Sequence, residues 1–181
     1  LRRRHIISRN EGAVPLERWS FLESFAREKY GLDIKVHVYR NDLNGGTGTF
    51  KDPAASMAAS LFNELGIKQY CIASTGNSAT AYAKYLSMAK VNCSVFMPED
   101  AIKTSEATIS SYGQQVFRVK GDYAKAKEIA AGYAKLHGIP MSTGNIDPIR
   151  VEAKKTMVFE WLGQMDQFPD VYIQAVSGGT G

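Results

Sequence analysis

A lysine at the end of a glycine-rich loop is the residue of this sequence best suited to covalent chemistry. Lys51 closes the loop at 44–50 and precedes Asp52 and Pro53, which suit the N-cap and the first position of a helix. The positive end of a helix dipole disfavours a charged lysine, so it favours the neutral amine that forms a Schiff base with an aldehyde. The alternative is a lysine that merely precedes a helix.

Two further turns are candidates for anion binding. The turn at 74–78 joins a predicted strand to a predicted helix, and it combines hydroxyl and amide side chains with free helix N–H groups. This combination favours a carboxylate, and an ordinary capped turn is the alternative. Asp147 and Pro148 repeat the cap-and-proline start, which puts Arg150 in the first helical turn. There Arg150 either reaches an anion or is simply solvated.

The last residues of the sequence indicate a phosphate-binding loop. An apolar run at 171–176 leads directly into the glycine-rich turn at 177–181. A strand followed by glycines presents free N–H groups to a phosphate, and the next helix would begin beyond residue 181. We therefore expect a truncated chain. The turn lacks the spacing of a dinucleotide fingerprint or a nucleotide P-loop, so those two interpretations are weak.

Alternating strands and helices must position these loops. The expected helices are at 17–30, 53–65, 77–89, 101–111, 123–137 and 148–162, and the expected strands at 33–39, 70–73, 92–97, 115–119, 139–142 and 171–176. Gly31 is expected to end the first helix. Repeated units of this spacing predict an α/β fold in which helices cover a parallel sheet.

Composition excludes several other classes of protein. With 181 residues, 44% of them hydrophobic, the chain can bury one sizeable core or two small ones. The net charge is +4, and its only basic cluster, Arg2–Arg4 with Arg9, suggests a solvated or frayed terminus more than a nucleic-acid arm. Cys71 and Cys93 lie in apolar runs and suggest buried thiols in a reducing, cytoplasmic compartment. No stretch has the length of a membrane span or the spacing of a metal site.

Taken in order, these motifs resemble the fold type II family of pyridoxal-phosphate enzymes, and within it the threonine synthases. The likeness runs from residue 12 to residue 181. Gly48-Thr-Phe-Lys51-Asp52 is similar to the family's lysine motif, and 73–79 to its asparagine loop. Residues 147–156 look like the helix start where threonine synthases carry Asn-Pro-x-Arg and a Glu-Gly-Gln-Lys-Thr run, and 177–181 look like the glycine loop for the cofactor phosphate.

The sequence departs from this pattern at three places. Pro53 stands where the family usually has Arg, and Glu152-Ala-Lys154 stands in place of Glu-Gly-Gln. Gly144, Asn145 and Asp147 replace the Asn, Ser and Asn found in threonine synthases near the substrate phosphate. An Asp beside a phosphate dianion is repulsive, unless Asp147 is turned into the helix cap.

The resemblance implies pyridoxal 5'-phosphate as the cofactor and Lys51 as the catalytic Schiff-base residue. It also implies that Asn77 bonds the 3-oxygen of the cofactor. The remaining cofactor contacts implied are Ser177, Gly178, Gly179, Thr180 and Gly181. The substrate contacts implied are Ser74, Thr75, Asn77, Ser78 and Arg150.

The fold implied is the two-lobed fold type II architecture, with parallel sheets flanked by helices and the C-terminal half absent. Residues 1–52 would start the large cofactor-binding lobe, 53–143 would form a small mobile lobe, and 144–181 would continue the large lobe. The activity implied is that of a lyase in a homodimer, which turns the amino acid O-phosphohomoserine into threonine by eliminating phosphate and adding water. Cysteine synthase-like β-replacement and serine or threonine dehydration are alternatives within the family. A non-catalytic, nucleotide-binding Rossmann-like module is the alternative outside it.

Overall fold

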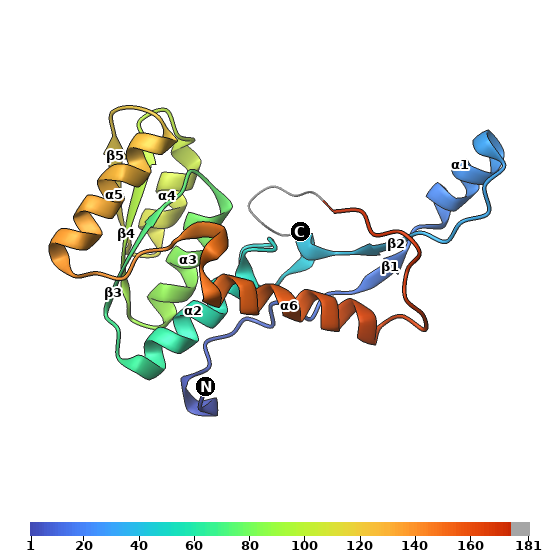
Figure 1. Cartoon of the computed structure of the whole chain (residues 1–181), viewed down its shortest axis with the longest axis horizontal. Helices are drawn as coiled ribbons and strands as arrows, with labels where there is room; N and C mark the ends of the chain where they lie inside the picture. The colour runs from blue at the N-terminus through green and yellow to red at the C-terminus, as the bar shows by residue number, and fades with distance from the viewer. Residues whose placement is uncertain (175–181) are drawn as a thin grey trace.

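The computed structural model describes residues 1–174, which form an α/β body with a small antiparallel strand pair beside it (Figure 1). The elements in chain order are β1 (Leu16–Arg18), α1 (Ser20–Tyr30), β2 (His37–Tyr39), α2 (Asp52–Leu65), β3 (Gln69–Ala73), α3 (Asn77–Met88), β4 (Asn92–Pro98), α4 (Lys103–Ser111), β5 (Gln115–Val119), α5 (Tyr123–His137) and α6 (Pro148–Gly163). The alternation from α2 onward confirms the fold class expected from the sequence.

The body is built on a parallel sheet in the order β3-β4-β5. A single parallel bridge from Cys71 to Met141 adds a fourth segment beside β3, where a strand at 139–142 was expected. Helices α3 and α4 cover one face of the sheet, and α5 covers the other (Figure 1). Helices lie on both faces because crossovers between parallel strands are right-handed: the connections from β3 to β4 and from β4 to β5 run in one direction, and the connection from β5 back to Met141 beside β3 runs in the opposite one.

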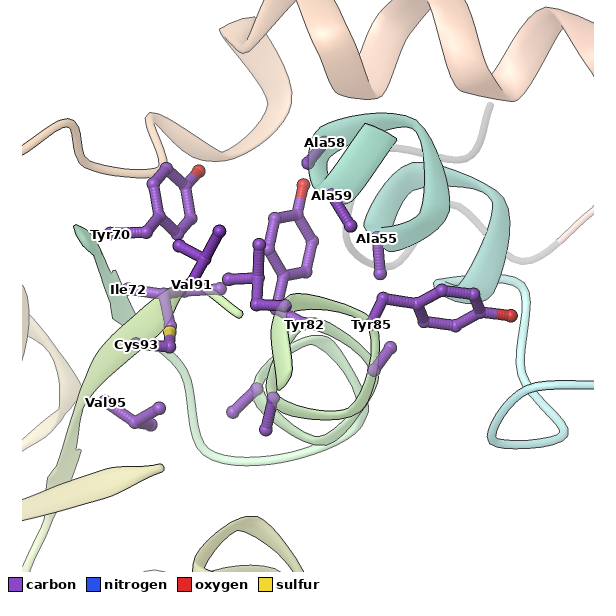
Figure 2. Close-up of a cluster of buried hydrophobic side chains, with 14 of the residues drawn as sticks. Ala55, Ala58, Ala59, Tyr70, Ile72, Tyr82, Tyr85, Val91, Cys93 and Val95 are labelled. Carbon is purple, nitrogen blue, oxygen red and sulfur yellow. The ribbon is translucent and has the colours of Figure 1, made fainter. Parts of the chain in front are cut away.

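Alternating side chains of β3 divide the core between these two faces. Tyr70 and Ile72 point to the side of α2 and α3, whereas Cys71 belongs to the cluster under α5. The ring of Tyr70 stacks on that of Tyr82 from α3, with centroids 5.7 Å apart. Ala55, Ala58 and Ala59 of α2 lie beside Tyr82 and Tyr85 of α3 (Figure 2), and their small side chains let α2 approach α3 closely. The main core therefore ties the start of α2 to the sheet.

The antiparallel pair β1–β2 lies outside this body and is reached by α6 (Figure 1). The expectation of a continuous helix at 17–30 was wrong at its start, because 16–18 pair with β2 and α1 begins at Ser20. Gly31 ends α1 in the left-handed conformation, at φ 64°, as expected. Gln164 at the end of α6 donates to the carbonyl of Val14 at 3.0 Å, which joins the helix to the segment before β1.

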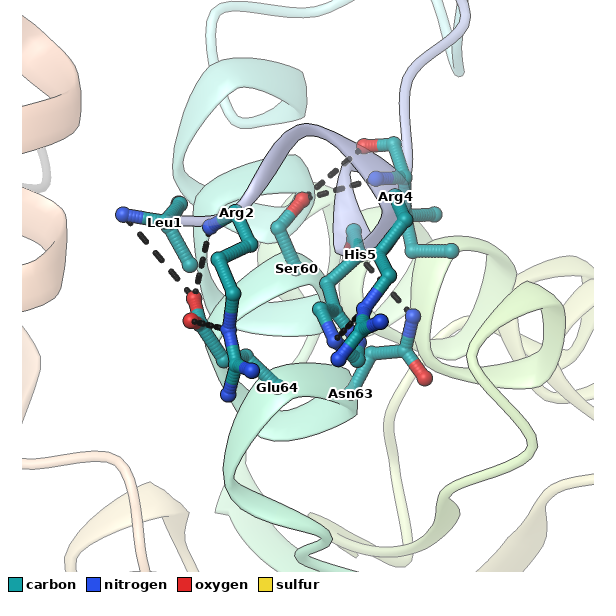
Figure 3. Close-up of polar contacts among 8 residues, drawn as sticks. Leu1, Arg2, Arg4, His5, Ser60, Asn63 and Glu64 are labelled. Carbon is teal, nitrogen blue, oxygen red and sulfur yellow. Dashed lines mark hydrogen bonds and ion pairs between the residues drawn. The ribbon is translucent and has the colours of Figure 1, made fainter.

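The basic N-terminal segment packs along α2 (Figure 3). Ile7 N–H donates to the Ser60 hydroxyl at 2.8 Å, and the Ser56 hydroxyl donates to the carbonyl of Ile7 at 2.7 Å. Arg2 forms an ion pair of 3.0 Å with Glu64. The segment is therefore held by backbone contacts and is not frayed, although its arginine side chains are exposed.

Several other expectations can be compared with the described residues. Both cysteines are free and buried, as expected. Within residues 1–174, no helix combines the length and apolar character that crossing a membrane needs, and no group of His, Cys, Asp and Glu is arranged to hold a metal. Residues 171–174 form no strand, and the remainder of that expected strand, with the whole of Ser177–Gly181, lies outside the described residues.

Candidate active site

Lys51 lies at the start of α2, directly before the first helical residue, and only 9% of it is exposed. Asp52 was expected to be the N-cap of this helix, and that expectation was wrong. The fully buried Asp52 carboxylate instead faces back into the loop, where it accepts the N–H groups of Thr47 at 2.8 Å and Thr49 at 3.1 Å and the Thr47 hydroxyl at 2.7 Å. These three bonds hold the loop that leads to Lys51.

Gly46 allows the same loop to lie against the body. A Cβ atom added at Gly46 would fall inside van der Waals contact with the Tyr85 hydroxyl and the Asp52 carboxylate. The Lys84 ammonium on α3 donates to the Gly46 carbonyl at 2.5 Å. The loop is therefore packed on α3 at a position that only glycine fits. This packing fixes the position of Lys51 at the end of the loop.

The pKa of Lys51 is lowered from 10.5 to about 8, chiefly because the amine is buried and then because Arg150 and Lys154 are close. The sequence predicted a lowered pKa but gave a different cause, the helix dipole. Burial disfavours the charged amine because it removes water, and two neighbouring cations repel it. The Nζ atom lies 3.8 Å from the centroid of the Phe50 ring. A larger share of neutral amine is the property that an attack on an aldehyde needs.

A small cavity adjoins Lys51, between the start of α2 and the first turns of α6. Its volume is about 10 Å³, close to the space of one water molecule. Its charged lining residues within the described part of the chain are Lys51, Arg150 and Lys154. Arg150 and Lys154 are one helical turn apart, so they lie on the same face of α6. The cavity is strongly positive.

Arg150 joins this cavity to the turn at 74–78. It is 7% exposed, so the expectation of a merely solvated arginine does not hold. Its guanidinium donates to the hydroxyl of Ser78 at 3.1 Å and to that of Ser142 at 3.4 Å, and lies 5.9 Å from the ring of Tyr82. Two of the loops that the sequence singled out thus meet in space, although about seventy residues separate them.

The turn at 74–78 begins α3 and is capped by its own first residue. The Ser74 oxygen accepts the N–H groups of Gly76 at 3.4 Å and Ala79 at 3.2 Å. Thr75 and Asn77 are exposed, and Ser78 is half-buried beside Arg150. Ser74 therefore stabilises the helix start, while the side chains of Thr75 and Asn77 are exposed.

Asp147 is turned into the start of α6, as the second of its two expected placements requires. Its carboxylate accepts the Ile149 N–H at 3.0 Å, and the residue is 6% exposed. Pro148 occupies the first helical position. Together with the Asp147 cap it fixes where α6 starts, and so the direction in which the Arg150 side chain projects from the helix.

Lys154 is the site residue that sequence reasoning did not predict. The sequence feature that could have indicated it is its spacing of four residues from Arg150, because this spacing places both side chains on one face of a helix. Burial and the charge of Arg150 lower the pKa of Lys154 as well. The sequence could not show that this face of α6 turns toward Lys51, because α2 and α6 are far apart along the chain.

Fold and site together define an α/β protein that presents a buried, easily deprotonated lysine beside cationic anion-binding groups. A family model described as pyridoxal-phosphate dependent enzyme matches residues 7–181, and the chain belongs to that family. Pyridoxal phosphate, the cofactor of this family, suits these residues because it carries both an aldehyde for the amine and anionic groups for the cations.

Among curated proteins, the chain is similar to threonine synthases. It is 34% identical to the threonine synthase of Methanocaldococcus jannaschii over 173 aligned residues. The alignment covers 94% of this chain and 41% of the relative. It is 32% identical over 167 residues to that of Halalkalibacterium halodurans, covering 92% of this chain and 45% of the relative. The chain thus spans less than half the length of these relatives.

Among solved structures, the fold is similar to that of other pyridoxal-phosphate enzymes. A pyridoxal 5'-phosphate-dependent aspartate racemase superposes with a TM-score of 0.72 at 23% identity, over 84% of this chain and 46% of that one. A threonine deaminase isoform from Solanum lycopersicum superposes with a TM-score of 0.69 at 20% identity, over 85% and 43%. At these identities the likeness establishes the fold and leaves the reaction open.

Proposed function

We propose that the protein carrying this chain is a pyridoxal-phosphate-dependent lyase of the threonine synthase type, which converts O-phosphohomoserine to threonine. The observation that carries the proposal is Lys51, whose amine has a pKa lowered to about 8 in a cavity it shares with Arg150. The similarity to threonine synthases over more than nine-tenths of the chain supports the reaction type.

In this proposal Lys51 has two tasks. Its neutral amine would bind the aldehyde of the cofactor, and when it is not bound there it would be placed to accept the proton from the substrate α-carbon. The bound cofactor supplies an electron sink that makes this proton acidic. A pKa of about 8 suits both tasks, because a useful fraction of the amine is neutral near neutral pH.

Other residues would anchor the cofactor and the substrate. The cofactor would be held by Asn77 at its 3-oxygen and by Ser177–Gly181 at its phosphate. The substrate carboxylate would be held by the hydroxyls of Ser74, Thr75 and Ser78. The Ser74 oxygen already accepts helix N–H groups, which leaves its hydroxyl hydrogen available for a carboxylate.

Arg150 would hold the phosphate of the substrate, to which it is suited because it is buried and because its side-chain hydrogen bonds among the described residues go to the neutral hydroxyls of Ser78 and Ser142. Closure of the lobe at 53–143 over this site would exclude water until phosphate has left. The complete protein would act as a homodimer in the cytoplasm.

The cofactor assignment to Lys51 is tested by the visible absorbance of the complete gene product. We expect Lys51→Ala to lose the absorbance of the covalently held cofactor. Lys155→Ala should keep it, because Lys155 is an exposed lysine paired with Glu152 at 2.6 Å. A Lys51→Ala protein with the spectrum of the wild type would refute the assignment.

β-Replacement or dehydration is the second candidate reaction, favoured by Gly144 and Asn145, which stand where threonine synthases carry Asn and Ser near the substrate phosphate. Asp147 does not separate the two candidates, because its carboxylate is turned into the helix cap. A substrate panel separates the candidates. Turnover of O-phosphohomoserine supports the first, whereas turnover only of O-acetylserine with a thiol, or of serine or threonine, supports the second.

A further inference from the structure

The cavity beside Lys51 carries more positive charge than one lysine needs. Arg150 and Lys154 enter it from α6, one turn apart, and Lys51 enters from the start of α2. No acidic side chain of the described residues lines it. Cations gathered in a poorly hydrated space repel one another, and burial with the nearby Arg150 does lower the pKa of Lys154. An arrangement of this kind is stabilised by a bound anion.

The acidic residues of the two flanking helices are engaged elsewhere. On α2, Asp52 accepts bonds from Thr47 and Thr49, and Glu64 at the far end pairs with Arg2. Those of α6 and its cap have the following partners: Asp147 accepts Ile149 N–H, Glu152 pairs with Lys155, and Glu160 accepts from Gln164. Within residues 1–174, Lys154 has no ion pair with any of them.

We propose that Lys154 is a further substrate-binding residue, which joins Arg150 in holding the distal anionic group of the substrate, so that the cationic face of α6 beside the small cavity selects a divalent group over a singly charged one. The inference deepens the proposed function and rests on it. Lys154 stands where the run of threonine synthases has glutamine, so the additional charge is a feature of this sequence.

Two cations suit a phosphate dianion better than one for a geometric reason. The planar guanidinium of Arg150 binds two oxygens, while the ammonium of Lys154 adds a point charge from one turn further along the helix. The Arg150 bonds to Ser78 and Ser142 involve neutral oxygens, which a stronger acceptor can replace. Lys51 itself is engaged by the cofactor in this proposal, so the pair on α6 remains for the substrate.

The phosphate of the cofactor is the competing occupant, and Lys154→Gln distinguishes the two. The variant removes the charge and restores the glutamine of the threonine synthase run. Lys155→Gln is the matched control, since Lys155 is the next residue, exposed and paired with Glu152. Both variants are made in the complete gene product with cofactor bound. Three quantities are measured for each: the inhibition constant of inorganic phosphate, KM and kcat for O-phosphohomoserine, and cofactor affinity from visible absorbance.

We expect Lys154→Gln to raise the inhibition constant of phosphate and KM by about tenfold, the usual effect of losing one charge-assisted contact. Cofactor affinity, kcat and inhibition by singly charged formate should change far less, and Lys155→Gln should resemble the wild type. Unchanged phosphate inhibition would overturn the proposal, as would weaker cofactor binding in place of weaker phosphate binding.

Failure of the proposed function gives a different result. If the wild-type protein does not turn over O-phosphohomoserine, the reaction is wrong, but calorimetric titration of the cofactor-loaded protein with inorganic phosphate still tests Lys154. Weaker phosphate binding by Lys154→Gln then supports the anion site, and equal binding by both proteins refutes it. A thermal transition equal to that of the wild type confirms that the variant is folded.

Discussion

Replacing Lys51 by methionine should stabilise the folded apoprotein. Lys51 is 9% exposed, and its pKa lies at about 8 where an ordinary lysine has 10.5. In the folded state the amine of Lys51 therefore binds its proton less tightly than in the unfolded state, and this difference lowers the free energy of unfolding. Methionine has a similar length and no charge, so it avoids the cost of burying the ammonium, and its thioether can keep a contact with the Phe50 ring that the Lys51 ammonium lies over.

The size of the effect follows from the two pKa values. At about 1.36 kcal/mol for each pKa unit, the cost is at most about 3 kcal/mol at pH 7, where the amine is charged in both states. Between pH 8 and 10.5 the unfolded state binds more protons than the folded one, so the stability of the wild type rises with pH. The advantage of methionine should therefore fall below about 1 kcal/mol near pH 10.

Urea unfolding of the two apoproteins at several pH values measures this difference directly. Taking the difference between variant and wild type cancels the titration of all other groups. Lys84→Met is the control, because Lys84 is a half-buried lysine that donates to the Gly46 carbonyl, and its loss should destabilise the protein. A Lys51→Met protein that is less stable than the wild type at pH 7, or whose advantage does not depend on pH, would refute the reasoning.

Three further predictions concern the elements around the site. Gly46→Ala should destabilise the protein by about 1–3 kcal/mol in urea unfolding, because the new methyl group meets the Tyr85 hydroxyl; an increase in stability would contradict this packing. Asp147→Ala should cost about 1 kcal/mol, the value of a helix cap, and Asp147→Asn should restore most of it. Cys71 and Cys93 should resist thiol reagents until the chain unfolds, because burial raises the pKa of both thiols, that of Cys71 to about 11; fast labelling of the native protein would show that they are accessible.

Local signals were sufficient to predict most of the described body. The side chain of Asp122 caps the start of α5, and Gly138 follows its last residue in the left-handed conformation; both signals lie in residues next to the helix. Strand β4 could be predicted from its largely apolar run, because both faces of a parallel sheet are covered and its residues are buried on both sides. The short strand β1 was missed because its three residues gain stability only from pairing with 37–39, far along the chain.

The site shows the same division between local and distant information. The sequence predicted Lys51 and the Asp147 cap from residues beside them. It misassigned Asp52, because a carboxylate before a helix can bond forward to the helix or back to the loop, and only the packing of Gly46 decides between them. The meeting of Arg150 with Ser78 depends on how α6 crosses α2, which no local pattern encodes.

The central claim, that Lys51 is the residue that holds the cofactor, is tested most directly by covalent mapping. The complete gene product is loaded with pyridoxal phosphate, treated with borohydride to fix the cofactor on the lysine that holds it, digested, and sequenced by mass spectrometry. We expect the added mass on Lys51. The same mass on Lys154, or on any other lysine with Lys51 unmodified, would contradict this claim.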